Sequence, residues 1–160
     1  MKQTKEMLED WYSKPDQWNY FSNEDDAKRK EKILSVLGKT KYKKGLDVGC
    51  GEGFIAQSLP CKEIFGYELS DNACLRWDKK IKRVEVVSEK YDLVVSTGTL
   101  YNEYEHESIA ETIRSSASKH ILIAGIKELI LPYEFGKLIS ETEFEYRGFT
   151  QIVKLYEVAS

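Results

Sequence analysis

Three glycines at alternate positions follow a short apolar run that carries a carboxylate. Residues 45–48 read Gly-Leu-Asp-Val, and Gly49, Gly51 and Gly53 come after them. A side chain at any of these glycines would stand between the backbone and whatever it approaches, and glycine also permits the positive φ that a tight loop needs. The pattern predicts a strand that runs into a loop whose backbone is a ligand-binding surface.

Two carboxylates and one thiol accompany this loop, and each has an alternative role. Asp47 near the strand's end either caps the loop by accepting backbone N–H bonds or binds a ligand, and the two roles can coexist. Glu68 ends the next predicted strand and is either an ordinary solvated acid or a ligand-binding group; its place one strand on from the glycines favours binding. Cys50 is better explained as a small residue tolerated in a tight loop than as a nucleophile.

Strands alternate with helices along the chain. We expect helices over 3–12, 24–37, 52–59, 71–79 and 105–118, and strands over 45–48, 63–68, 91–96, 120–126, 142–147 and 149–158. The run 91–96 is almost entirely apolar, as in a parallel strand covered on both faces. The pattern predicts an α/β fold with a mostly parallel sheet, whose ligand crevice lies at the carboxyl ends of the strands.

We expect one domain over residues 1–160, with N-terminal helices and an aromatic lid in 1–40 and the ligand-binding core in 41–160. Residues 14–21 carry Trp18, Tyr20 and Phe21. An aromatic segment of this kind either closes over a site as a lid or anchors the neighbouring helices to the core.

Composition excludes several classes of protein. The chain has 41% hydrophobic and 32% charged residues, as is usual for a globular protein. Its formal net charge of -3 argues against general binding of nucleic acids. No apolar run is long enough to span a membrane and the first residues lack the apolar core of a signal peptide, so we expect a cytoplasmic protein. Three cysteines without a C-x-x-C pair and two separated histidines predict neither a disulfide framework nor a metal site.

The run Leu46-Asp47-Val48-Gly49-Cys50-Gly51-Glu52-Gly53, with Glu68 after it, resembles the first two motifs of the class I S-adenosylmethionine-dependent methyltransferases. The spacing G-x-G-x-G differs from the G-x-G-x-x-G of dinucleotide-binding folds. The resemblance implies a Rossmann-like fold with an antiparallel C-terminal strand and S-adenosylmethionine as cofactor. It also implies that the glycine loop passes under the methionine part of this cofactor. Glu68 would then accept hydrogen bonds from both hydroxyls of the cofactor's ribose.

Two further segments look like the nodulation-protein-S-like branch of that family. They are Trp18-Asn19-Tyr20, with Lys28, Arg29 and Lys30 following, and the run 91–101. The resemblance covers about residues 10–126 and implies methyl transfer to an oxygen or nitrogen of a small-molecule acceptor. Tyr101, Tyr104 and His106 are the candidates to orient the acceptor or remove its proton, although each is as often structural. The implied cofactor-binding residues are Trp18, Tyr20, Asp47, Gly49, Cys50, Gly51, Gly53, Phe54, Glu68, Leu69, Ser96, Thr97 and Leu100.

The chain departs from the family between Glu68 and Tyr91, where a helix, a third strand and another helix are normally found. A third strand over 83–87 would leave three residues, spanning at most roughly 10 Å, to cross about 14 Å of sheet. The third strand is therefore either a short remnant or missing, and we prefer the second alternative. Because the loop after this strand usually covers the adenine, we expect a thin adenine wall and weak cofactor binding.

Other functions stay open. The shortened middle also suits a protein that binds the cofactor, a protein partner or a second copy of itself without catalysis. A nucleic-acid methyltransferase is disfavoured because Ser96-Thr97-Gly98-Thr99 is not the Asp/Asn-Pro-Pro-aromatic signature of base-amine methylation. A nicotinamide oxidoreductase is disfavoured by the glycine spacing.

Overall fold

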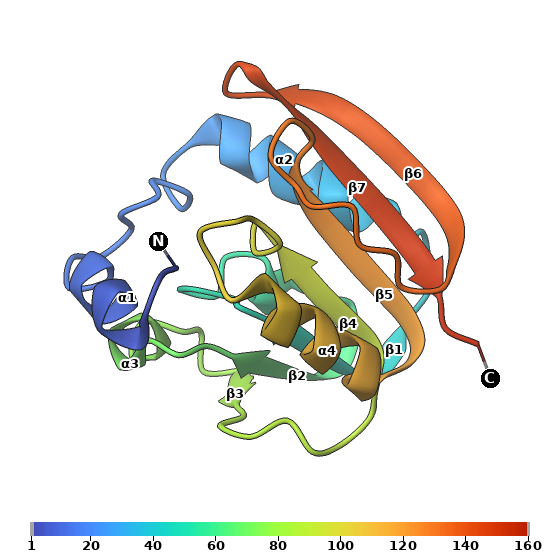
Figure 1. The fold of residues 1–160 in the computed structure, drawn as a ribbon, viewed down its shortest axis with the longest axis horizontal. Coiled ribbons are helices and arrows are strands. Elements are labelled where there is room, and N and C mark those ends of the chain that lie inside the picture. Colours follow the sequence, from blue (N-terminus) through green and yellow to red (C-terminus); the bar gives the residue numbers. More distant parts are fainter. Residues whose placement is uncertain (1, 160) are drawn as a thin grey trace.

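The computed structural model describes residues 2–159, which form one sheet of seven strands with helices on both faces (Figure 1). The strands are β1 (Tyr42–Val48), β2 (Cys61–Tyr67), β3 (Ile81–Arg83), β4 (Tyr91–Thr97), β5 (Ala117–Ile126), β6 (Lys137–Tyr146) and β7 (Phe149–Glu157). The helices are α1 (Lys5–Trp11), α2 (Glu24–Ser35), the 3-10 turn η1 (Ala56–Ser58), α3 (Asp71–Cys74) and α4 (His106–Ser116).

The sheet is mostly parallel, as predicted. Its order is β3-β2-β1-β4-β5-β7-β6, and β7 runs antiparallel to both of its neighbours. Arg147 and Gly148 connect β6 to β7 with φ of 49° and 81°, the positive pair that a tight two-residue hairpin turn needs. The predicted Rossmann-like architecture with an antiparallel C-terminal strand is therefore confirmed.

The third strand is reduced, and our preference for its absence was wrong. β3 pairs in parallel with residues Ile64 to Gly66 of β2 at the edge of the sheet. It ends at Arg83, four residues earlier than the strand that we had considered, so residues 84–90 remain for the return to β4. Seven residues reach up to about 23 Å. This is enough to cross three strand spacings, which add up to about 14 Å.

Two predicted helices are largely absent. Gly51 and Gly53 adopt positive φ, and Pro60 follows closely, so the predicted helix over 52–59 shrinks to the single turn η1. The helix predicted over 71–79 ends at Cys74 because the chain folds back, where the indole N–H of Trp77 donates to the Gly51 carbonyl at 2.7 Å. In both places the shorter helix leaves an irregular segment that lies against the glycine loop.

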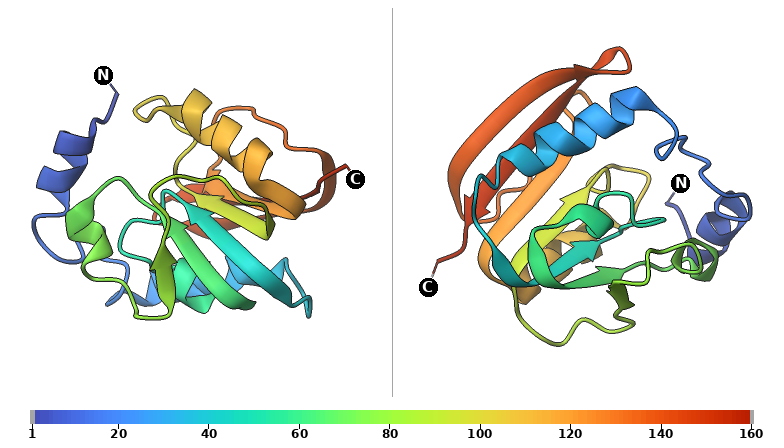
Figure 2. Two further views of the ribbon diagram at one scale, coloured as in Figure 1. Left: turned by 90° about the horizontal axis from the view of Figure 1, so that it is seen from below. Right: turned by 180° about the vertical axis from the view of Figure 1, so that it is seen from behind.

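The core lies on both faces of the sheet because alternate residues of β4 point in opposite directions. Leu93 packs in one buried cluster with Ile33 of α2 and Leu122 of β5. Val94 packs in a second cluster with Ile113 of α4. Figure 2 shows α2 and α4 covering opposite faces of the sheet. The carboxyl ends of β1, β2 and β4 stay open between these layers.

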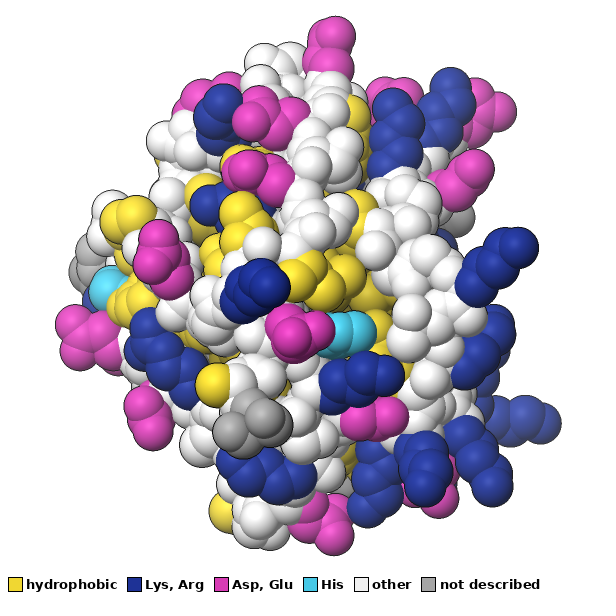
Figure 3. All heavy atoms as spheres, turned by 90° about the vertical axis from the view of Figure 1, so that its right-hand side faces the viewer, with side chains coloured by type: hydrophobic (Ala, Val, Ile, Leu, Met, Phe, Trp, Pro, Cys, Tyr) yellow, Lys and Arg dark blue, Asp and Glu magenta, His cyan; other side chains and the backbone are white. Residues whose placement is uncertain are grey.

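The surface is strongly charged. On the face that Figure 3 shows, acidic and basic side chains surround a small hydrophobic hollow, and Lys and Arg gather toward its lower right. Within residues 2–159, no helix has both the length and the apolar character needed to cross a membrane.

A buried carboxylate joins α2 to the β6–β7 hairpin. Asp26 is fully buried and accepts from Arg29 Nε at 3.1 Å, from the Tyr146 hydroxyl at 2.6 Å and from Arg147 Nη2. Each partner satisfies part of the charge that burial would otherwise leave unsolvated. Asp26 therefore fixes α2 against the end of the sheet where the cavity described below opens.

Replacing Asp26 by Asn should lower the free energy of unfolding by about 3 kcal/mol, because it leaves buried arginine charge without its counter-ion. Asp25→Asn, at the exposed neighbouring position, is the matched control and should change it by less than about 0.5 kcal/mol. Urea denaturation of the three proteins measures the difference. Equal midpoints for Asp26→Asn and Asp25→Asn would show that the network does not hold the helix.

Candidate functional site

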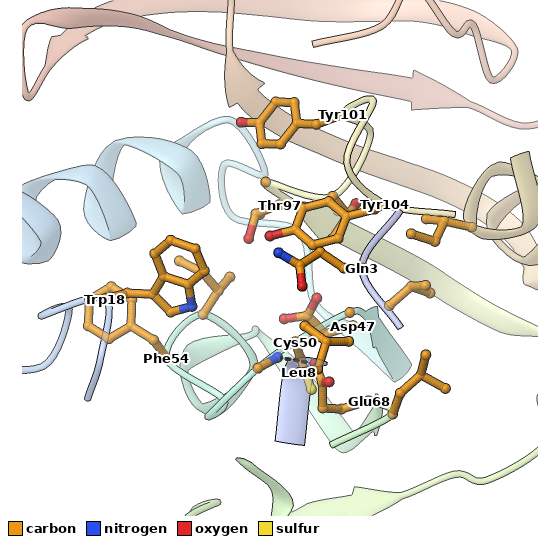
Figure 4. A pocket seen from close by; sticks show the side chains of 18 of the residues that line it. Gln3, Leu8, Trp18, Asp47, Cys50, Phe54, Glu68, Thr97, Tyr101 and Tyr104 are labelled. Carbon is orange, nitrogen blue, oxygen red and sulfur yellow. Dashed lines mark hydrogen bonds between the residues drawn. The ribbon is translucent and has the colours of Figure 1, made fainter. Parts of the chain in front are cut away.

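A cavity of about 340 Å³ lies where β1, β2 and β4 end (Figure 4). Its wall comes from the glycine loop, the N-terminal segment, the loop between β4 and α4, and the start of the β6–β7 hairpin. The carboxyl ends of parallel strands meet at one edge of a sheet, and that is where α/β folds bind ligands. The volume is within the usual range for small-molecule sites of roughly 300–1,000 Å³.

The three glycines of the loop have no room for a side chain. Gly49, Gly51 and Gly53 have φ of 73°, 54° and 82°. A Cβ on Gly49 would lie 2.7 Å from a Thr99 carbon, and one on Gly51 would lie 2.7 Å from the Tyr12 hydroxyl. The loop therefore needs glycine for its conformation and because protein neighbours occupy the space that a side chain would take.

Asp47 is the most unusual group at the site. Its side chain is 1% exposed, and its Oδ1 has no hydrogen-bond partner among the described residues. Burial raises the pKa of Asp47 well above its ordinary value, and the nearby Glu68 charge adds to the effect. Buried carboxylates are normally paired, so an unpaired one on a cavity wall indicates a ligand that supplies the missing donor.

Glu68 bridges the glycine loop and the end of β2. Its Oε1 accepts from the Gly51 N–H at 2.7 Å, and its Oε2 accepts from the Ser70 N–H at 3.0 Å. Burial raises the pKa of Glu68 despite these bonds. Each carboxylate oxygen can accept a second hydrogen bond, so Glu68 retains two acceptor positions for a ligand.

The N-terminal segment crosses the mouth of the cavity. The Gln3 N–H donates to the Glu103 carbonyl at 2.5 Å, and the Lys2 ammonium donates to the Tyr104 carbonyl at 2.7 Å. At the far end of α1, Glu9 accepts from the Asn72 N–H at 3.0 Å. The segment is thus tied to the loop after β4 on one side and to the loop after β2 on the other.

The aromatic segment lines the cavity and is anchored to the glycine loop. The Trp18 indole donates to the Tyr12 hydroxyl at 3.1 Å. Glu52 accepts from the Asp16 N–H at 3.1 Å and pairs with Arg76 at 3.2 Å. The predicted anchoring role is therefore observed, whereas the role of this segment as a lid stays a prediction.

Two tyrosines follow β4 on the cavity wall. The Tyr101 hydroxyl accepts from the Ile126 N–H at 2.8 Å, and burial raises the pKa of Tyr101. Burial likewise raises the pKa of Tyr104 to about 12. Both phenols therefore stay protonated near neutral pH and can donate hydrogen bonds to a ligand.

The structure brings most of the predicted residues to this cavity. Those on its wall are Trp18, Tyr20, Asp47, Gly49, Cys50, Gly51, Phe54, Glu68, Leu69, Thr97 and Tyr101. Burial raises the pKa of the Cys50 thiol well above its ordinary value, so Cys50 is not an activated nucleophile.

Four predicted residues do not reach the cavity. A Cβ on Gly53 would meet Ile81, Ser96 donates to the Val48 carbonyl at 2.8 Å, and Leu100 lies in the core. His106 points elsewhere, with its Nδ1 2.6 Å from the Tyr133 hydroxyl. Sequence position placed these residues near the right loops but did not fix the directions of their side chains.

Sequence reasoning missed several residues on the wall, which include Gln3, Leu8, Tyr12, Arg29, Tyr146 and Gln151. Arg29 is the sole cationic side chain among the lining residues within 2–159, and it is 5% exposed. Its guanidinium lies 4.7 Å from the centre of the Tyr20 ring and 5.1 Å from that of Tyr146. Its position four residues before Ile33, on the apolar stripe of α2, was the available signal.

No group of three or more His, Cys, Asp or Glu side chains in the described part of the chain is arranged to hold a metal ion.

The chain matches no family model and no curated protein sequence. Among solved structures, it is similar to the N-methyltransferase NodS from Bradyrhizobium japonicum WM9 in complex with S-adenosylhomocysteine, with a TM-score of 0.79, 15% identity, and coverage of 99% of this chain and 100% of that chain. It is also similar to magnesium protoporphyrin IX methyltransferase (ChlM) from Synechocystis PCC 6803 with bound S-adenosylmethionine, with a TM-score of 0.71, 16% identity and coverage of 97% of each chain.

A third similar structure is a putative RNA methyltransferase, PH1948, from Pyrococcus horikoshii, with a TM-score of 0.65, 16% identity and coverage of 92% of each chain. These likenesses span nearly the whole chain. They establish that it has the Rossmann-like class I methyltransferase fold, which confirms at the level of fold the resemblance seen in the sequence.

Asp47→Asn should stabilise the ligand-free protein by about 1–3 kcal/mol near neutral pH, because it removes an unpaired buried charge. Since the pKa of Asp47 is raised on folding, the native state binds more protons than the unfolded state. Stability should therefore fall as pH rises from the unfolded pKa of about 4 through the raised native value.

Thermal unfolding at pH 5 and pH 8 measures both effects. The wild-type melting temperature should drop more between the two pH values than that of Asp47→Asn. A variant that is less stable than the wild type at pH 8 would mean that Asp47 is a satisfied structural group.

Proposed function

We propose that this chain is an S-adenosylmethionine-dependent methyltransferase that acts on an oxygen or nitrogen of a small-molecule acceptor. The observation that carries the proposal is the buried Asp47 carboxylate on the cavity wall, whose Oδ1 has no partner among residues 2–159, beside a loop with glycine at positions 49, 51 and 53. The cofactor's amino-acid part carries an ammonium group that can donate to this carboxylate. The bound cofactors of the NodS and ChlM structures support the choice of ligand.

The residues on the wall fit the rest of this cofactor. Glu68 keeps two acceptor positions for the ribose hydroxyls. Arg29 is the cation available for the amino-acid carboxylate, and its planar guanidinium suits that partner. Leu69, which follows Glu68 directly, is a lining residue available to contact the adenine.

The charge of the cavity favours a cationic cofactor. Five acidic residues line it within 2–159, namely Asp47, Glu52, Glu68, Glu103 and Glu105, against the single cation Arg29. When bound, S-adenosylmethionine supplies a positively charged sulfonium as an activated methyl donor. An excess of carboxylates around that position stabilises the donor in the site.

The chain's own contribution to methyl transfer is positioning. Holding donor and acceptor in line at contact distance can supply most of the rate. Tyr101 donates a hydrogen bond toward the acceptor and is not a base, because its pKa is raised. A base is needed only for an acceptor whose proton must leave, and His106 lies outside the cavity, bonded to Tyr133.

The reduced sheet edge favours one alternative function, binding of the cofactor or a partner without catalysis. β3 has only three residues, and no lining residue within 2–159 falls between Leu69 and Thr97. The loop after β3, which would cover the adenine, thus contributes nothing to the wall. The two functions differ in one result, the presence or absence of a methylated product across a broad acceptor panel.

The thin adenine side predicts modest cofactor affinity. Calorimetric titration with S-adenosylhomocysteine should give a dissociation constant on the order of 1 μM or weaker, since little protein covers the base. A low nanomolar value would contradict this expectation.

Transfer of radiolabelled methyl groups to a metabolite extract tests the proposal. Glu68→Gln should retain the fold, weaken S-adenosylhomocysteine binding by about tenfold or more and reduce methyl transfer, because it removes the charge that accepts from the ribose. Glu85→Gln removes one charge at an exposed position and should behave as the wild type. If the two variants bind and transfer equally, the proposal fails.

A further inference from the structure

Gln151 lies on the cavity wall far along the chain from the cofactor motifs. It is part of β7, where it faces Ile126 of β5 on one side and Phe144 of β6 on the other. The side chain is 3% exposed and lines the cavity. Residues of a strand alternate between its faces, so Gln151 shares its face with Val153 and Leu155, which pack in the cluster under α2.

The carboxamide of Gln151 forms no hydrogen bond with the described residues, although the side chain is almost wholly buried. Its nitrogen and oxygen are not sealed in the protein, because Asp47 Oδ1 is the one enclosed and unpaired side-chain atom within 2–159. The amide therefore faces the open volume of the cavity. Buried amides are normally bonded, so Gln151 offers a donor and an acceptor to a ligand.

Gln151, Tyr101, Ile126 and Leu129 all line the cavity, and we call the part of the cavity that they line the chamber. The Tyr101 hydroxyl accepts from the N–H of Ile126, the strand partner of Gln151, and keeps its own proton to donate. Ile126 and Leu129 add apolar wall. In the view of Figure 4, Thr97 and Tyr104 lie between Tyr101 and Asp47.

The charged side chains on the α2 side of the cavity pair with one another. Asp26 is shared by Arg29 and Arg147, which leaves one net positive charge from these three residues. In the proposed function, the cofactor carboxylate neutralises that charge at Arg29. The Tyr146 hydroxyl is committed to Asp26 and does not serve as a free donor.

We infer that Gln151 is a specificity-determining residue for the methyl acceptor, and that the acceptor is an uncharged molecule with a carbonyl, hydroxyl or amide group that bonds to Gln151 and the Tyr101 hydroxyl. This inference rests on the proposed function for the identity of the transferred group. The chamber itself is a property of the described residues. An acceptor without such a group leaves the buried amide unpaired and binds less well.

Three probes of similar size test the chamber: benzamide, benzoate and benzylamine. Each is titrated into the whole protein, with and without saturating S-adenosylhomocysteine, while the side-chain amide resonances are followed in proton–nitrogen NMR spectra. The Gln151 pair is assigned by its loss in Gln151→Leu. Gln57→Leu makes the same chemical change outside the cavity and is the matched control.

With S-adenosylhomocysteine bound, benzamide should bind more tightly than the two charged probes and should shift the Gln151 resonances. Gln151→Leu should weaken benzamide binding by about threefold to tenfold and leave S-adenosylhomocysteine binding unchanged, whereas Gln57→Leu should match the wild type. Equal benzamide binding by wild type and Gln151→Leu, tighter binding of either charged probe, or binding of none of the three would overturn the inference.

The result is separable from the proposed function. A protein that fails to bind S-adenosylhomocysteine contradicts the proposed function. The comparison of wild type with Gln151→Leu in the absence of S-adenosylhomocysteine still measures whether the carboxamide binds an uncharged polar group.

Discussion

The hydrogen bond from the Gly51 amide to Glu68, 2.7 Å long, is the contact on which the site depends. It joins the loop after β1 to the end of β2, so that the two strand ends form one continuous wall. Gly51 has a positive φ, and the Tyr12 hydroxyl occupies the space where a side chain would begin. The Trp77 indole holds the Gly51 carbonyl from the other side. One residue, Gly51, thus bonds to the carboxylate and to Trp77 and lies against Tyr12 of the N-terminal segment.

Around this contact, the protein keeps polar groups buried at a cost to its own stability. Asp47 has an unpaired carboxylate oxygen, and Gln151 has an amide that faces the cavity without a partner. Such groups are rare because desolvation is not repaid within the fold. They line one cavity, and this arrangement is expected when a donor molecule and an acceptor molecule each supply part of the missing hydrogen bonding.

The sequence predicted the sheet and the cofactor side of the site because both depend on local patterns. The alternation of strands and helices predicted the α/β fold. The glycine spacing, together with Asp47 and Glu68, predicted the ligand-binding loop. The third strand was misjudged because its ending at Arg83 depends on pairing with β2, which no local pattern shows. Gln151 and Arg29 were missed because each looks like an ordinary polar residue until the packing of β7 and α2 turns it inward. His106 was near the right loop, but its bond to Tyr133 is a tertiary contact.

The central claim is that Asp47 binds the ammonium group of the cofactor's amino-acid part. Calorimetry with two ligands tests it most directly: S-adenosylhomocysteine, and 5′-methylthioadenosine, which has the same nucleoside but no amino-acid part. The wild type should bind S-adenosylhomocysteine more tightly than 5′-methylthioadenosine, and Asp47→Asn should lose most of that difference while its affinity for 5′-methylthioadenosine stays the same. Equal affinity of the wild type for the two ligands, or an undiminished difference in Asp47→Asn, would contradict the claim.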